Sequence, residues 1–311
     1  MPLIELQHTP SIWHQYGRAL LSFRRGHSPH QSHPRLPNVV IQQSVAAPDN
    51  ESIKPFCELC HTPPSDYLPM TYPHLLAFPL HMELLLHPDF PFPLPGLIHI
   101  TNRIVQHQPV PLNARLNIQC RFGDLIESHK GLEFDIETNV KAGETTLWES
   151  TSTNLYRGHA SPHQHSAIHT VKTDKQATGQ TTKAPFNGCV NTSPQQIQHW
   201  TIPEQTGRHY AALSGDCNPI HLHRLSARLF GFPRAIAHGM WHLANALGHL
   251  DSLIPANRGY IVTTVFKKPI FLPSTVQFQY TCPPDKQRID FVIKNQSGVI
   301  PHQESAIDIM T

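Results

Sequence analysis

Residues 210–250 contain the side chains whose types and spacing are best suited to chemistry. The stretch begins Y-A-A-L-S-G-D-C-N-P-I-H, which places Asp216 and His221 on one loop with Asn218 and Pro219 between them. An imidazole titrates near neutrality, and a carboxylate can orient or deprotonate a neighbour, so such a pair can act together on one water molecule. The spacing therefore indicates a general acid/base pair, although the same residues also occur in ordinary turns.

A second feature follows in the same stretch. The sequence A-I-A-H-G-M-W-H-L-A-N-A-L-G-H-L is typical of an apolar helix whose first turn holds His238 and Gly239. A glycine lets a ligand approach its backbone N–H closely. At a helix start this N–H has no intrahelical partner and lies at the positive end of the helix dipole, so it can stabilise an oxyanion. An acid/base pair beside an oxyanion site predicts proton transfer next to a carbonyl group.

These two motifs, in this order and spacing, resemble the signature of the MaoC-like dehydratases, also called hydratase 2 or R-specific enoyl-CoA hydratases. The resemblance implies that Asp216 and His221 hold and activate the water, that the Gly239 amide polarises the thioester carbonyl, and that Asn218 shapes the loop. It also implies the hot-dog fold, a curled antiparallel sheet around one long helix. Some bacterial members carry a serine further along the helix, where this chain has Leu247.

The activity implied by the resemblance is that of a hydro-lyase in fatty-acid metabolism. It would interconvert (3R)-3-hydroxyacyl and trans-2-enoyl thioesters of CoA or an acyl-carrier protein, with no metal and no cofactor. The residues expected to contact the substrate are Asn218, Pro219, Ile236, His238, Met240 and Lys267. Met240 lies on the helix that would line an acyl channel, although any central helix buries such residues. Lys267 and its neighbour Lys268 could meet substrate phosphates, although exposed lysines are commonly only solvated.

Two other functions share parts of this pattern. A hot-dog thioesterase would use the same fold and substrate class but would release the free thiol, and the N-P-I-H loop followed by H-G-M argues against it. A non-catalytic module that binds acyl thioesters is the second alternative. Crotonyl-CoA distinguishes the three, because a hydratase removes the conjugated enoyl absorbance, a thioesterase releases CoA, and a binding module does neither.

The composition excludes several classes of protein. The chain has 311 residues, a formal net charge of +2 and 15% charged residues, so nothing indicates a nucleic-acid surface. No run approaches 18 apolar residues, and the first residues lack the pattern of a signal peptide, so we expect no membrane span and a cytoplasmic location.

The six cysteines form no disulfide framework, which fits a reducing compartment. Cys57 to His61 spell C-x-x-C-H, but without export we expect neither haem nor zinc there.

The chain also contains a weak internal repeat. Residues 56–60 can be aligned with residues 210–214, and on that register Thr62 replaces Asp216 and Tyr67 replaces His221. Apolar helices follow, with residues 78–82 opposite 236–240. Strand-like runs come after each helix: 97–106, 112–120, 132–141 and 145–155 in the first half, and 259–266, 275–281, 288–294 and 304–309 in the second. Another strand-like run, N-V-V-I-Q-Q-S-V, follows Pro37.

We therefore expect an α+β protein made of two hot-dog units. Residues 1–157 would form a degenerate unit that begins with an amphipathic helix at residues 12–23, packed on the outside of that unit. Residues 158–185 are rich in Gly, Ser, Thr, Gln and Lys, which is typical of a flexible linker. Residues 186–311 would form the unit with the active site. The two units would pack as a pseudo-dimer within a monomer or within a homodimer.

Overall fold

The computed structural model of the protein describes residues 1–24, 34–157, 196–255, 258–281, 283–284 and 287–310. The expected linker at residues 158–185 lies outside the described residues. Within the described ranges, no helix combines the length and the apolar character that crossing a bilayer requires.

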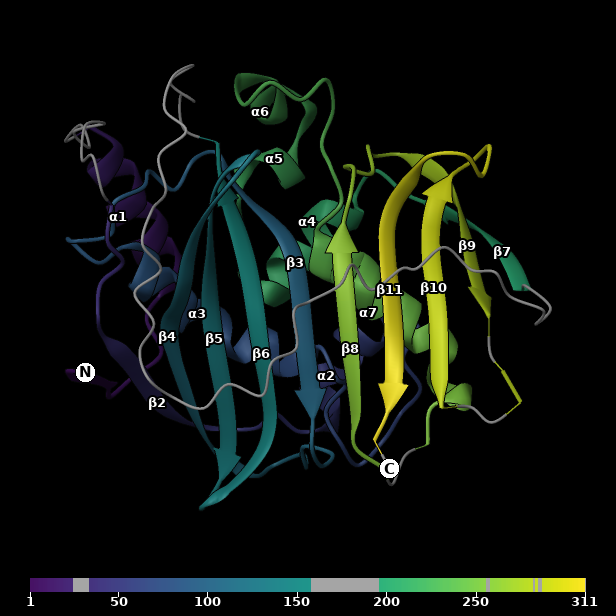
Figure 1. The fold of residues 1–311 in the computed structure, drawn as a ribbon, viewed down its shortest axis with the longest axis horizontal. Coiled ribbons are helices and arrows are strands. Elements are labelled where there is room, and N and C mark those ends of the chain that lie inside the picture. Colours follow the sequence, from purple (N-terminus) through teal and green to yellow (C-terminus); the bar gives the residue numbers. More distant parts are fainter. Residues whose placement is uncertain (25–33, 158–195, 256–257, 282, 285–286, 311) are drawn as a thin grey trace.

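One large sheet forms the framework of the molecule (Figure 1). It has eleven strands in the order β1-β2-β4-β5-β6-β3-β8-β11-β10-β9-β7. Their bounds are Leu3–Leu6 (β1), Val40–Ala46 (β2), Leu97–Gln106 (β3), Arg115–Ser128 (β4), Gly131–Ala142 (β5), Thr145–Tyr156 (β6), Gln196–Ile202 (β7), Tyr260–Phe266 (β8), Ser274–Thr281 (β9), Arg288–Asn295 (β10) and Pro301–Ile309 (β11). Strands β1 and β2 pair in parallel and all the other neighbours pair antiparallel. The sheet is therefore mixed, and the expected α+β class is confirmed.

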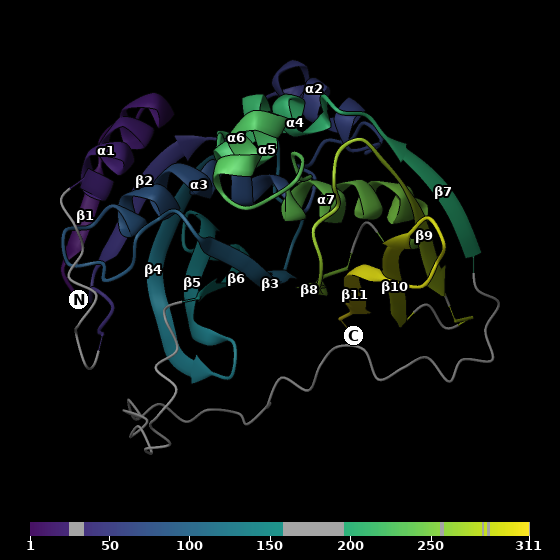
Figure 2. The ribbon, with the colours of Figure 1, turned by 90° about the horizontal axis from the view of Figure 1, so that it is seen from above.

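The helices lie on one side of this sheet, which curves around two of them (Figure 2). Their bounds are Ile12–Arg24 (α1), Asn50–Leu59 (α2), Tyr72–Leu85 (α3), Thr206–Ser214 (α4), Pro219–Leu222 (α5), Arg224–Leu229 (α6) and Gly239–Leu250 (α7). The two helices inside the curve, α3 and α7, are apolar on nearly all sides, as expected for helices enclosed in a core. Leu80 and Leu84 of α3 and Leu243 of α7 have no exposed surface. Burying each such leucine contributes about 1.5–3 kcal/mol.

The two halves of the chain share the sheet through β3 and β8. These strands pair antiparallel from Thr101 opposite Val265 to Gln106 opposite Tyr260. Side chains strengthen the junction on the helix side, where Trp241 Nε1 donates to the Leu59 carbonyl at 3.3 Å. Separating the halves would expose a full strand edge and break these contacts.

The strand-like runs expected from the sequence all form strands, but β1 and β7 were not predicted.

The expected equivalence between the halves holds only in part. His61 has a positive φ two residues after the end of α2, and Gly215 has a positive φ directly after α4, so these two residues match in conformation and Thr62 corresponds to Asp216. Tyr67, however, bridges to Pro111 as Ile236 bridges to Phe271. The structure thus aligns Tyr67 with Ile236 rather than with His221, because the residues of α5 and α6 are additional in the second half.

The helix register of the expected repeat is wrong for a related reason. Helix α3 begins at Tyr72, so residues 78–82 lie well inside it, whereas residues 236–240 span the start of α7. Pro79 interrupts the N–H pattern inside α3 but does not end the helix.

Candidate active site

The loop that follows α4 positions the candidate acid/base pair. Helix α4 ends at Ser214, and Gly215 adopts the left-handed conformation at φ 75°, with its N–H bonded to the Ala211 carbonyl. Glycine suits this position because other residues are strained there. Asp216 and Cys217 follow, and the Asn218 side chain then accepts a hydrogen bond from Ile220 N at the start of the short helix α5.

The Asp216 carboxylate accepts two hydrogen bonds and is still partly exposed. Its Oδ1 lies 3.3 Å from Asn218 N and 3.4 Å from the hydroxyl of Tyr16. Of its side-chain surface, 31% remains exposed, which leaves the carboxylate accessible to a small molecule. Burial would raise its pKa, but the nearby His238 and His221 and these donors outweigh that effect and lower it. The carboxylate is therefore ionised at neutral pH.

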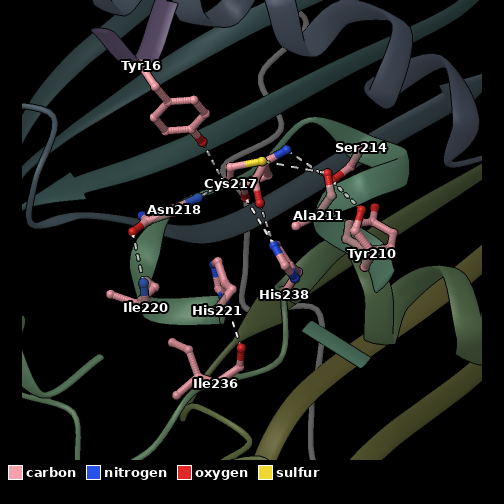
Figure 3. A network of polar contacts seen from close by, with 11 residues as sticks. Tyr16, Tyr210, Ala211, Ser214, Cys217, Asn218, Ile220, His221, Ile236 and His238 are labelled. Atoms are coloured by element: carbon pink, nitrogen blue, oxygen red, sulfur yellow. Dashed lines mark hydrogen bonds and ion pairs between the residues drawn. The ribbon is translucent and has the colours of Figure 1, made fainter. Parts of the chain in front are cut away.

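His221 lies on α5 with one ring nitrogen fixed. Its Nδ1 is 2.8 Å from the Ile236 carbonyl oxygen (Figure 3). A carbonyl can only accept, so Nδ1 donates the proton and Nε2 carries the free lone pair of the neutral ring. Burial lowers the pKa of His221, whereas the charge of Asp216 opposes that shift. A neutral imidazole with an available Nε2 can serve as a general base.

His238 connects the loop to the start of α7. It is the N-cap residue of this helix, and its Nε2 donates to the backbone carbonyl of Asp216 at 2.9 Å. The same Nε2 is 3.9 Å from Asp216 Oδ2, and only 3% of the side chain is exposed. Burial lowers the pKa of His238 to about 3. A contact between His238 and the substrate stays a prediction; the contacts of the ring hold the loop in place.

Gly239 directly follows His238, so its backbone N–H lies beside the acid/base pair. Within the described ranges, no oxygen accepts a hydrogen bond from this N–H. A Cβ atom added at Gly239 would lie 3.0 Å from Cε1 of Phe266, so the aromatic ring leaves little space at this position. The structure therefore places a free N–H at a helix start, as the oxyanion hypothesis requires.

Potential ligand atoms of Asp216, His221 and His238 lie within 4.8 Å of one another. One nitrogen of each imidazole is already engaged by a backbone carbonyl, and the two rings stack. Each neutral ring therefore has one nitrogen left with a free lone pair, which is what proton transfer requires.

The remaining residues expected to contact substrate occupy different surroundings. Pro219 is the first residue of α5, and Ile236 supplies the carbonyl that fixes His221. Met240 is buried in the hydrophobic core. Lys267 follows Phe266 at the end of β8, where its Nζ forms an ion pair with Glu304 at 3.0 Å. A role for Lys267 in binding phosphate stays a prediction and would compete with this ion pair.

The structure adds residues to the site that the sequence did not single out. Tyr16, on α1, contacts Asp216 although 200 residues separate them. His99 lies on β3 with its ring 5.1 Å from that of Phe266, and its buried Nε2 has no hydrogen-bond partner. The pairing of β3 with β6 shifts register between His99 and Thr101. No local pattern could have revealed either residue, because both belong to the half that lacks the motif.

Three comparisons with known proteins show which proteins this chain resembles. Residues 185–303 match the family described as MaoC like domain. The chain is 30% identical over 273 residues to 3-hydroxyacyl-thioester dehydratase X of Mycobacterium tuberculosis, covering 88% of this chain and 90% of the relative.

Solved structures show the same architecture. The crystal structure of HtdX from M. tuberculosis is similar with a TM-score of 0.68 and 26% identity, over 86% of this chain and 100% of that one. Peroxisomal multifunctional enzyme type 2 of Drosophila melanogaster shares the fold, with a TM-score of 0.61 and 16% identity over 98% of this chain and 53% of that one. The chain belongs to the family of MaoC-like dehydratases.

Proposed function

We propose that this dehydratase interconverts (3R)-3-hydroxyacyl and trans-2-enoyl thioesters at the site formed by Asp216, His221 and Gly239. One observation carries the assignment: the neutral His221 presents a free Nε2 next to an ionised Asp216, beside the unpaired N–H of Gly239. The stereochemistry and the choice of CoA or an acyl-carrier protein as the thiol rest on the family. No cofactor is needed for these steps.

The proposed reaction requires charge to develop on the thioester oxygen while a proton moves at the α carbon. In the hydration direction, His221 Nε2 accepts a proton from the water that attacks the β carbon. The Gly239 N–H binds the enolate-like oxygen, which is where negative charge appears. The imidazolium of His221 then gives this proton to the α carbon, so that one water has been added overall and the neutral base is restored. The charge of Asp216 orients the water and stabilises the imidazolium while it exists.

We further propose that residues 1–157 and 186–311 are two hot-dog units joined by residues 158–185. Each half supplies one buried helix, α3 or α7, and a set of mostly antiparallel strands. Pairing of β3 with β8 would then be the interface of a pseudo-dimer within one chain. Cys57, Cys60, Cys120 and Cys217 are free thiols, which supports a reducing, cytoplasmic environment.

Crotonyl-CoA tests the function directly. The purified chain should remove the conjugated enoyl absorbance without releasing free thiol, and the Asp216→Asn variant should do so far more slowly. Release of CoA in proportion to enoyl loss would instead assign a thioesterase. Saturable binding with no turnover of crotonyl, hexenoyl or decenoyl thioesters would assign a binding module.

A further inference from the structure

Helix α1 extends from the first half of the chain to the catalytic loop of the second. The hydroxyl of Tyr16 lies 3.4 Å from Asp216 Oδ1. Figure 3 shows the Tyr16 side chain directed towards the loop that carries Cys217 and Asn218. Ile12 lies one helical turn earlier, and a Cβ atom added at Gly215 would be 3.4 Å from its Cγ1. Two residues on one face of α1 therefore cover the loop, so this helix contacts the second half of the chain as well as the first.

Helix α1 is fixed in this place by polar contacts with α3. Gln15 is completely buried, and its Nε2 donates to the Pro79 carbonyl and to Glu83 Oε1, both at 2.8 Å. Arg18 Nη1 lies 2.7 Å from both carboxylate oxygens of Glu83. These two residues flank Tyr16 in sequence, so their bonds to Glu83 fix the helix close to where its hydroxyl meets Asp216.

We propose that Tyr16 is a positioning residue for Asp216, and that the contacts of Gln15 and Arg18 with Glu83 keep it in place. The proposal rests on the function given above. Asp216 Oδ1 receives two donors, the Tyr16 hydroxyl and Asn218 N. Oδ2, which is 3.9 Å from His238 Nε2, then remains the oxygen that can orient water. Fixing one oxygen of a carboxylate leaves the other in a defined direction.

The Tyr16 hydroxyl can donate a hydrogen bond to Asp216, but it does not give up its proton. Burial, together with the charge of Asp216, raises the pKa of Tyr16 far above its usual value, so the hydroxyl stays protonated. The donated bond is one of the influences that lower the pKa of Asp216. The other titratable groups that interact with this carboxylate are His221 on α5, His238 before α7, His99 on β3, Tyr210 on α4 and the adjacent Cys217.

The Tyr16→Phe substitution removes only the hydroxyl and is the main test. We expect kcat to fall about tenfold, as for the loss of one hydrogen bond to a charged group, with KM little changed. The acid limb of the kcat profile should move to higher pH, because a lost donor raises the pKa of Asp216. Arg18→Gln should cause a smaller change in the same direction. Trp13→Ala is the matched control, since this residue is on the same helix and 73% exposed.

A second readout does not depend on turnover. Carboxyl carbon NMR, with Asp216→Asn used to assign the signal, should show a higher Asp216 pKa in Tyr16→Phe than in the wild type. An unchanged pKa together with an unchanged pH profile would overturn the proposal. If the wild type processes no thioester, the proposed function fails, and the NMR comparison still decides the role of Tyr16.

Discussion

His221 and His238 stack face to face, with ring centroids 3.7 Å apart and planes 24° from parallel. Each ring donates one N–H to a backbone carbonyl, His221 to Ile236 and His238 to Asp216. Two positive charges this close would repel strongly, so the stack favours neutral rings. Neutral stacked rings leave the second nitrogen of His221 free for the proposed role as a base, while His238 is hydrogen-bonded to the loop.

Buried neutral histidines make the stability of this protein sensitive to acid. Burial lowers the pKa to about 3 for His81 and His238 and to about 4 for His99 and His242. In the unfolded chain these groups titrate near 6.5, so the unfolded state binds more protons below that pH. Their contribution to stability is complete above about pH 6.5 and falls as the pH drops towards 4.

We expect the free energy of unfolding to decrease between pH 7.5 and 5.5, by up to about 1.4 kcal/mol per pH unit for each such histidine below pH 6.5. Urea denaturation at a series of pH values measures this slope. His81→Asn removes one buried imidazole, so the unfolded chain takes up one proton fewer than in the wild type. The slope should therefore decrease by up to about 1.4 kcal/mol per pH unit. A free energy of unfolding that stays constant over this interval would contradict the assignment of neutral buried rings.

The catalytic pair should act as a unit. Asp216→Asn and His221→Ala should each lower kcat by about two to four decades, as is typical for the loss of a general acid or base. The double variant should be little slower than either single one, because the two groups serve the same step. Circular dichroism and melting temperature check that the variants fold. Near-wild-type turnover by either folded variant would rule out the proposed pair.

Gly239 combines an electronic role with a steric one, and two substitutions separate them. Gly239→Val keeps the backbone N–H, but its side chain should block the approach of the thioester oxygen to that N–H, so we expect kcat to fall by about two to three decades, and stability should also fall because the side chain pushes on Phe266. Phe266→Leu in the same chain provides space and should restore much of the melting temperature while kcat stays low. Recovery of both quantities would show that Gly239 matters only for packing.

The first half should be required for solubility but should supply no acid/base pair of its own. Residues 186–311 alone would expose the β8 edge that β3 covers and the surface around Trp241. Size-exclusion chromatography should therefore find this fragment aggregated or self-associated. Thr62→Ala and Tyr67→Phe in the full chain should leave kcat within about twofold, since neither side chain is an effective base near pH 7. If the fragment is monomeric and soluble, the claim that the second half needs the first half to cover β8 is wrong.

The sequence predicted the parts of this molecule that depend on local pattern. Residues close together in the sequence form the motif around Asp216 and Gly239. The same is true of the alternating pattern that predicts the strands. The contact between Tyr16 and Asp216 joins residues 200 positions apart, and only the folded sheet brings their helices together. Strand β7 was missed because Gln196–Ile202 is mostly polar and becomes a strand by pairing with β9. Tyr67 was misaligned because α5 and α6 lengthen only the second half.

The most direct test of the account is to hydrate crotonyl-CoA in water labelled with oxygen-18 and to analyse the product. The wild type should form (3R)-3-hydroxybutyryl-CoA with the label on the β carbon, and folded Asp216→Asn should form it at least about a hundredfold more slowly. Free labelled crotonate, or label incorporation by Asp216→Asn at the wild-type rate, would contradict the proposed chemistry at Asp216 and His221.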